Sequence, residues 1–203
     1  MLKQIKQSSD LKNIFFNINE LKSCGKNVII GKTVRIRYPE LVELGDNVII
    51  DDFTYISTGL KIHNNVHISA GCKIIGGKFA FVEMFDFSTL SPNVVLSAGS
   101  DDYIGGIATP LVPNEYKGNV IIGKIILNKH CIVGSGSVVL PNVTFYDGAC
   151  VGALSLVNIN LIEWSLFAGI PAKYIKDRKR EQILNFERLY KLEIQDIINN
   201  DNK

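Results

Sequence analysis

The chain has 203 residues, of which 46% are hydrophobic, and its 22 basic and 20 acidic side chains leave a formal charge of only +2. The length suits one domain with at most small appendages, and the composition is that of an ordered protein. So small a charge gives no electrostatic basis for binding nucleic acid. The sequence contains no run of about 18 apolar residues that could span a membrane, and no signal peptide is visible. We therefore expect a cytoplasmic protein.

The N-terminal segment, residues 1–24, includes the amphipathic stretch "LKNIFFNINELK" at positions 11–22. We therefore predict a short helical cap over residues 1–24. The stretch carries no motif with chemistry of its own.

From residue 25 onward, aliphatic residues recur at intervals of six. An α-helix turns about 600° in six residues and cannot keep this period on one face. Gly, Asn and Pro also recur too often for long strands. Two steps of eight residues interrupt the first series, and a second series has none. The first series is Ile30, Ile36, Leu44, Ile50, Ile56, Ile62, Ile68, Ile74, Val82, Ser88 and Val94, and the second is Leu127, Val133, Val139, Phe145, Val151 and Val157.

This period fits a triangular coil in which each hexapeptide supplies one short strand and one bend. Three hexapeptides give about 18 residues per coil, and successive coils pair as parallel strands about 4.8 Å apart. The sequence therefore predicts a mainly β protein, with a parallel β-helix over residues 25–175. The two eight-residue steps, at "RYPEL" and "GGKFAF", predict that successive coils start at Ile30, Ile50, Ile68 and Ser88, with both bulges at one corner.

The repeat is absent from "SDDYIGGIATPLVPNEYKGNVIIG", residues 100–123. A loop of this length inside a compact repeat is usually functional, although a plain surface insertion is the other interpretation. Beyond the second series, residues 176–203 change to a helical pattern. The apolar positions Ile183, Phe186, Tyr190, Ile194 and Ile197 predict a C-terminal helix that covers the last coil or packs between subunits.

Two stretches, "IVGSGSVVLPNVTFYDGACVGALSLV" and "FAGIPAKYIKDR", carry a resemblance to the hexapeptide-repeat acyltransferases. The similarity covers about residues 25–180 and is strongest for the sugar O- and N-acetyltransferases of bacterial surface-polysaccharide synthesis. It implies a left-handed β-helix, a homotrimer and acetyl-CoA as the donor. Crossovers between parallel strands are otherwise right-handed, so the left hand rests on the resemblance alone. The loop would then reach a neighbouring subunit and wall the active site.

The resemblance also shows a departure from the family's pattern. Family members place a catalytic His where the coil breaks into the loop, and this chain has Asp101 there, followed by Asp102. An alcohol needs a general base, and an ordinary aspartate with a pKa near about 3.9 is a feeble one. A free amine is nucleophilic by itself. The missing His therefore favours an amino sugar, with Asp101 and Asp102 bonding the amine.

Coil arithmetic suggests further candidates near the loop. His63, Glu83 and Asp101 each follow an expected inward position and are separated by one predicted coil, which would place them in one column. Such a column could share a proton, or its members could simply be solvated side chains on one face. His130 lies at a bend in the first coil after the loop. It could approach the loop of a neighbouring subunit, although a structural role is the simpler interpretation. His67 falls at a corner and is expected to face solvent.

The donor site is expected at "GSGS" (134–137) and "GALS" (152–155), which are separated by one coil and should stack. Small residues there let pantetheine approach backbone amides. The candidates are Gly134, Ser135, Ala153 and Ser155. The resemblance adds Lys173 and Arg178 against the 3′-phosphate of CoA.

The sequence thus predicts transfer of an acetyl group from acetyl-CoA to an amino or hydroxyl group of a sugar, nucleotide-linked or a surface-glycan precursor. No metal is expected, since the four cysteines have neither CxxC spacing nor a neighbouring His cluster. Two other hypotheses stay open. A non-catalytic β-helix scaffold would explain the missing His, and an enzyme similar to the γ-carbonic anhydrases would need His63, His67 and His130 to converge.

Overall fold

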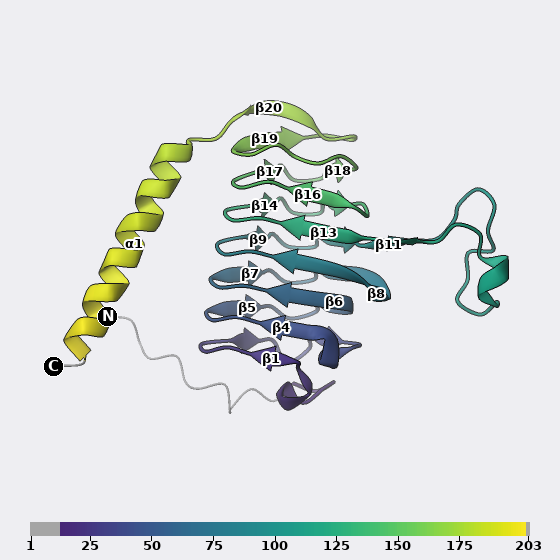
Figure 1. Ribbon diagram of the computed structural model, residues 1–203, viewed down its shortest axis with the longest axis horizontal. Helices are drawn as coiled ribbons and strands as arrows, with labels where there is room; N and C mark the ends of the chain where they lie inside the picture. The colour runs from purple at the N-terminus through teal and green to yellow at the C-terminus, as the bar shows by residue number, and fades with distance from the viewer. Residues whose placement is uncertain (1–12, 202–203) are drawn as a thin grey trace.

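The computed structural model describes residues 13–201, and of residues 198–201 the backbone alone. Short parallel strands stack into a triangular prism, with an α-helix along one side and a long loop projecting from the other (Figure 1). This is the predicted left-handed parallel β-helix. No helix within the described range is long and apolar enough to cross a membrane.

The coils have three faces, numbered in chain order. The first face contains β2 (Ile29–Ile30), β5 (Val48–Ile50), β7 (Val66–Ile68), β9 (Thr89–Leu90), β14 (Ile132–Val133), β17 (Cys150–Val151) and β19 (Ser165–Ala168). The second contains β3 (Arg35–Ile36), β10 (Val95–Ser97), β15 (Val138–Val139) and β18 (Leu156–Val157). The third contains β1 (Ser23–Cys24), β4 (Val42–Leu44), β13 (Lys124–Leu127) and β16 (Val143–Phe145). Two longer strands, β6 (Tyr55–Ile62) and β8 (Lys73–Met84), bend from the second face into the third.

Three corners separate these faces, and we name them by what lies there. The glycine corner joins the first and second faces and contains residues 31–34, 51–54, 69–72, 91–94, 134–137 and 152–155. The loop corner joins the second and third faces and contains the 3-10 helix η3 (Pro39–Leu41) and residues 76–80 and 98–123. The helix corner joins the third and first faces and contains residues 45–47, 63–65, 85–87, 128–131, 146–149 and 162–164.

The core consists of columns of inward-pointing side chains. Every predicted inward position of both series is buried, and none is more than 5% exposed. Each side chain stacks on its equivalent in the next coil, as Ile30 does on Ile50 and Ile50 on Ile68. Stability of such a stack is a sum over neighbouring coils.

The predicted coil lengths are wrong at the third coil. Ile68 pairs with Leu90 rather than with Ser88, and Ile74 pairs with Leu96, so this coil is two positions longer than expected. Val82 is buried in a different column, where it stacks on Leu60. A coil has two inward columns per face, so a register error of two positions still gives buried side chains.

Both ends of the prism differ from the prediction. Residues 1–12 of the predicted helical cap lie outside the described residues, and the part described has one 3-10 turn, η2 (Ile18–Glu20), followed by β1. The Asn17 side chain caps that turn by accepting a hydrogen bond from the Asn19 amide, which favours a turn over a longer helix.

At the C-terminal end, the expected helix over 176–203 begins later. Strand β20 (Lys173–Asp177) first pairs antiparallel with β19, and α1 (Arg180–Asp201) follows. The edge of the last coil is therefore covered by a strand, because an open edge would leave backbone groups unpaired. The helix runs back along the helix corner toward the first coils (Figure 1).

Candidate active site

The long loop leaves and re-enters the prism through a two-stranded stem. Strands β11 (Gly99–Ser100) and β12 (Ile121–Ile122) pair antiparallel and carry the loop well clear of the coils (Figure 1). The stem packs closely on the bulge of the third coil. A β-carbon at Gly99 would lie 2.7 Å from the carbonyl oxygen of Gly76, so glycine is required at this approach.

Asp102 closes the base of this loop. Its carboxylate accepts hydrogen bonds from the backbone amides of Ile104 (2.9 Å), Gly105 (3.0 Å) and Asn119 (2.9 Å). These bonds, that from Asn119 foremost, lower the pKa of Asp102. Both carboxylate oxygens are thus used by the protein. Asp102 thus has a structural role at the base of the loop, and its expected contact with a substrate amine stays a prediction.

Asp101 has different surroundings. It lines a hollow of about 760 Å³ between the loop stem and the third-coil bulge. The Asp101 side chain is exposed and makes no hydrogen bond or ion pair with any residue in the described range. The other residues lining the hollow include Ile75, Gly76, Gly77, Phe79, Gly99, Ser100, Thr109, Lys117, Asn119 and Ile121. An acceptor molecule in this hollow would meet a free carboxylate.

The side chains of His63 and Glu83 meet, although the two residues are not in register as the coil arithmetic suggested, because Glu83 pairs with Lys61. Asp101 does not join them. The His63 Nε2 lies 2.8 Å from Glu83 Oε1, and the ring stacks on Phe85 with centroids 4.3 Å apart. This pair lies near the helix corner, whereas Asp101 lies at the loop corner, where the strands of the third face begin. The predicted column fails because the third coil is longer than expected and because the chain leaves the prism at Ala98.

His130 lies under the C-terminal helix and away from the loop. Its Nε2 is 2.8 Å from Glu187 Oε2 on α1, and its ring stacks against Phe87 and lies near Trp164. Burial alone would raise the pKa of Glu187, but hydrogen bonds from Lys191, Lys129 and His130 outweigh it and lower this pKa to about 2. The structural interpretation of His130 therefore fits better than a catalytic one.

Each histidine of the chain is paired with a carboxylate. His67 Nε2 lies 2.8 Å from Asp51 Oδ2, in addition to the His63–Glu83 and His130–Glu187 pairs. Within the described residues, no group of three or more His, Cys, Asp or Glu side chains is arranged to hold a metal ion. The histidines of one chain do not converge as a carbonic-anhydrase-like site would require.

The predicted donor residues lie on the glycine corner of the last coils. Gly134 is packed so closely on the next coil that a β-carbon would collide with the Ala153 backbone. Ser135 and Ala153 are exposed. Ser155 is buried, whereas a donor-site residue is expected to be exposed. Its Oγ points inward, where it donates to Gly152 O (2.8 Å) and accepts from Gly169 N (3.0 Å).

Lys173 and Arg178 also differ from one another. Arg178 Nη1 donates to the carbonyl oxygens of His130 (2.7 Å) and Gly148 (2.6 Å), which ties the end of β20 to the helix corner. Lys173 is exposed beside Ala168, near the glycine corner, and forms no ion pair within the described chain. Of the two cations predicted to bind phosphate, Lys173 is the one whose charge faces solvent.

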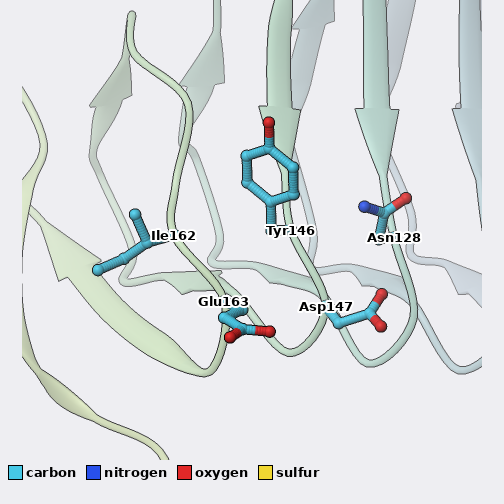
Figure 2. Close-up of a pocket in the computed structure, with 5 residues that line it drawn as sticks. All are labelled: Asn128, Tyr146, Asp147, Ile162 and Glu163. Carbon is cyan, nitrogen blue, oxygen red and sulfur yellow. The ribbon is translucent and has the colours of Figure 1, made fainter.

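Two further hollows lie elsewhere on the prism. One, of about 350 Å³, is lined at the helix corner by Asn128, Tyr146 and Ile162 from successive coils together with Asp147 and Glu163 (Figure 2). It contains no predicted site residue. The other, of about 450 Å³, lies on the second face of the first coils and is lined by Phe15, Arg35, Ile36, Arg37 and Tyr55. These last residues were not singled out from the sequence, although Arg35, Tyr55 and Lys73 have the spacing of coil neighbours.

Comparison with known proteins gives consistent relatives. Residues 42–76 match the bacterial transferase hexapeptide (six repeats) family. The chain is 37% identical to dTDP-4-amino-4,6-dideoxy-D-glucose acyltransferase of Escherichia coli over 175 residues, which cover 84% of this chain and 88% of the relative.

Solved structures extend the likeness to the whole prism. AntD, an N-acyltransferase from Bacillus cereus in complex with dTDP and 3-hydroxybutyryl-CoA, has a TM-score of 0.83 and 36% identity, covering 90% of this chain and 99% of AntD. A serine-to-cysteine variant of AntD, in complex with dTDP-4-amino-4,6-dideoxyglucose and coenzyme A, has a TM-score of 0.81 and 36% identity, covering 88% and 98%. With its hexapeptide coils, its inserted loop and this extent of identity, the chain belongs to the hexapeptide-repeat acyltransferase family.

Proposed function

We propose that this protein transfers an acyl group from acyl-CoA to the amino group of a dTDP-linked 4-amino-4,6-dideoxy sugar. The observation that carries the proposal is the 37% identity, along most of both chains, to the acyltransferase that acts on such a sugar. The solved structures of AntD with dTDP-linked amino sugar and coenzyme A support the same pair of substrates. We place the reaction in the cytoplasm, where the expected CoA donor is available.

In the proposed reaction the amine attacks the thioester carbonyl carbon directly. A carbon–nitrogen bond forms, the carbon–sulfur bond breaks, and coenzyme A leaves as its thiolate. The surplus proton of the nitrogen passes to the free carboxylate of Asp101 and from there to solvent or to the departing thiolate. Backbone amides at the glycine corner would bind the pantetheine arm, and Lys173 would bind a phosphate of the donor.

The free carboxylate of Asp101 favours an amine over a hydroxyl as acceptor. None of the described residues that line the hollow beside the loop is a histidine. An alcohol would need a base strong enough to take its proton during attack, whereas an unprotonated amine attacks with its own lone pair. A carboxylate is sufficient to orient the amine and to take its proton afterwards.

We further propose that the active enzyme is a homotrimer in which the loop of one subunit reaches the next. The loop exposes large apolar side chains that nothing in the described part of the same chain covers: Tyr103 is 90% exposed, Ile104 100% and Leu111 90%. Apolar side chains gathered at a projecting tip are characteristic of an interface. A neighbouring prism would then close the hollow at Asp101.

The test is an acceptor and donor screen that follows release of coenzyme A. We expect turnover with dTDP-4-amino-4,6-dideoxyglucose and none with dTDP-glucose, which offers only hydroxyl groups. Acetyl-CoA and 3-hydroxybutyryl-CoA, tested side by side, identify the preferred acyl group. No turnover with any dTDP-linked amino sugar, together with no thermal stabilisation by millimolar CoA, would overturn the proposal in favour of a scaffold.

A further inference from the structure

The second face of the prism carries a column of outward side chains in its first three coils. Arg35 pairs in register with Tyr55, and Tyr55 with Lys73. Neighbouring strands are about 4.8 Å apart, so the two cations have their backbones separated by about 10 Å, with the phenol between them. Arg37, two positions beyond Arg35, adds a third cation and lines the same hollow of about 450 Å³.

Within the described part of the chain, no carboxylate neutralises these cations. Neither Arg35, Arg37 nor Lys73 forms an ion pair with a carboxylate of the described residues. Arg35 lies over the Phe15 ring, 5.7 Å from its centroid, and Arg37 lies over Tyr38 at 5.6 Å. Lys73 Nζ donates only to the Gly71 carbonyl oxygen, at 3.1 Å, and the Tyr55 hydroxyl makes no hydrogen bond within the described range. A column of unneutralised donors fits an anionic ligand.

The column leads directly to the hollow beside Asp101. Ile75 follows Lys73 by two positions on the same strand, so both side chains point outward, about 7 Å apart along the strand. Ile75 lines the hollow that contains Asp101. Ile75 also pairs in register with Ser57 in the coil below and with Ser97 in the coil above. One continuous surface therefore runs from Arg35 to Asp101.

We propose that Arg35, Tyr55 and Lys73, with Arg37 at the rim, bind the diphosphate of the nucleotide-linked acceptor sugar. The guanidinium groups can bind phosphate oxygens with two parallel N–H bonds, Lys73 supplies a point charge, and the Tyr55 hydroxyl donates a hydrogen bond. The sugar then extends toward Asp101, which presents its carboxylate to the amine. This inference rests on the proposed function for the identity of the acceptor.

Coenzyme A also contains a diphosphate, so the two substrates share the chemistry that this column recognises. Position favours the acceptor. The column belongs to the first three coils, below the loop, whereas Gly134, Ala153 and Lys173 belong to the last coils, above it. A donor bound along the last coils and an acceptor bound along the first would meet at the loop.

The experiment compares the binding of dTDP and of coenzyme A to Arg35→Gln and Lys73→Met by titration calorimetry. Each variant loses one charged hydrogen-bond donor, so we expect the Kd for dTDP to rise about 10-fold or more while the Kd for coenzyme A stays unchanged. The KM for the dTDP-linked sugar should rise in parallel. Arg188→Gln is the matched control, because Arg188 is exposed on α1 and, among the described residues, its side chain bonds only Asn185.

The outcomes separate this inference from the proposed function. Weaker binding of coenzyme A in place of dTDP would assign the column to the donor and overturn the inference. An unchanged Kd for dTDP in both variants, or no binding of dTDP by the wild type, would overturn it as well. Wild-type binding of dTDP that both variants weaken, without any acyl transfer, would support the column and reject the proposed reaction.

Discussion

Asp101 and Asp102 are adjacent in the sequence, but their carboxylates have different surroundings. Asp102 is occupied by three backbone amides, and Asp101 is exposed at the hollow with no partner in the described chain. A carboxylate that already accepts bonds from the protein has little capacity left for a substrate. We therefore assign the proposed chemistry to Asp101 and the shape of the loop to Asp102.

Replacing Asp101 by Asn should lower kcat about 100-fold, because the amide cannot take the proton that the attacking amine must lose. The Kd for coenzyme A should not change, since the proposed donor site lies on other coils. Steady-state kinetics and calorimetry measure the two quantities. Glu115→Gln, an exposed position in the same loop, serves as the control. An unchanged kcat would remove Asp101 from the chemistry.

Replacing Asp102 by Ala should loosen the loop without removing a contact with the substrate. We expect the amides of Ile104, Gly105 and Asn119 to exchange their hydrogens faster, because each loses its acceptor. In the wild type, the pKa of Asp102 is lowered in the folded state. The stabilisation of the loop by its carboxylate is therefore fully present above the ordinary pKa of 3.8, and it is lost as the pH falls through the lowered pKa. Amide exchange measured against pH tests both statements, and equal exchange in the variant would contradict them.

At this scale the sequence indicates residue types better than residue roles. Asp101 stood out because a histidine was expected at that point, and the structure leaves it free. Ser155 and Arg178 matched an expected pattern, yet the side chains of both bond backbone groups, Ser155 those of Gly152 and Gly169 and Arg178 that of His130. The direction of a side chain at a corner depends on the local dihedral angles, which a single sequence does not specify. Glu187 gave no signal, because its partners His130 and Lys129 are far from it in the sequence.

Helix α1 is attached to the prism through Glu187. The carboxylate receives bonds from Lys129 (2.9 Å), His130 (2.8 Å) and Lys191 (2.6 Å), and Tyr190 adds an edge contact with Phe87. The predicted stripe on this helix is only partly right. Ile183 and Ile194 are half-buried, whereas Phe186 is 58% exposed. A charged residue, rather than the apolar stripe alone, therefore fixes the helix on the prism.

Glu187→Gln should lower the free energy of unfolding by about 2 kcal/mol at neutral pH, because three donors lose a charged acceptor. In the wild type, the contribution of Glu187 to the free energy of unfolding is fully present above pH 4.5 and is lost as the pH falls toward about 2. The variant should not show this loss of stability in acid. Denaturant titrations from pH 7 down to pH 2 measure it, with Glu193→Gln, exposed on the same helix, as the control. Parallel pH profiles for Glu187→Gln and the wild type would contradict the assignment.

The cations at the start of strand β20 and just after its end differ in role: Arg178 bonds the prism, whereas Lys173 is the candidate for binding the donor. Lys173→Met should raise the KM for acyl-CoA about 10-fold and leave kcat and the sugar KM nearly unchanged, because only a phosphate contact is lost. Lys26→Met, an exposed position at the far end of the prism, should change neither constant. If the KM for the sugar changes instead, the donor does not lie along the last coils.

For the molecule as a whole, the six-residue period was sufficient to predict the prism and its core. It was not sufficient to predict the register after "GGKFAF". Each face has two inward columns, so Met84 and Val82 are both fully buried, and hydrophobicity cannot distinguish a step of eight positions from one of ten. The path of the loop could not be predicted either. The six-residue repeat is absent from the loop, so the repeat cannot place the loop on a coil. The stem of the loop forms by antiparallel pairing and by the close approach of Gly99 to Gly76.

The projecting loop makes a prediction about assembly. Ile104 and Leu111 are almost fully exposed, and burying two such side chains against a neighbouring subunit contributes about 3 kcal/mol or more per interface. If the proposed trimer forms, the double variant Ile104→Ser/Leu111→Ser should therefore sediment as monomers at concentrations where the wild type sediments as a trimer. Its circular dichroism should be unchanged, because the prism does not depend on the loop tip. Its activity should fall with the trimer population and recover at high protein concentration, which a defect in the catalytic group would not do. If the variant remains a trimer and is inactive, the tip contacts substrate instead, and the closure of the hollow by a second subunit must be abandoned.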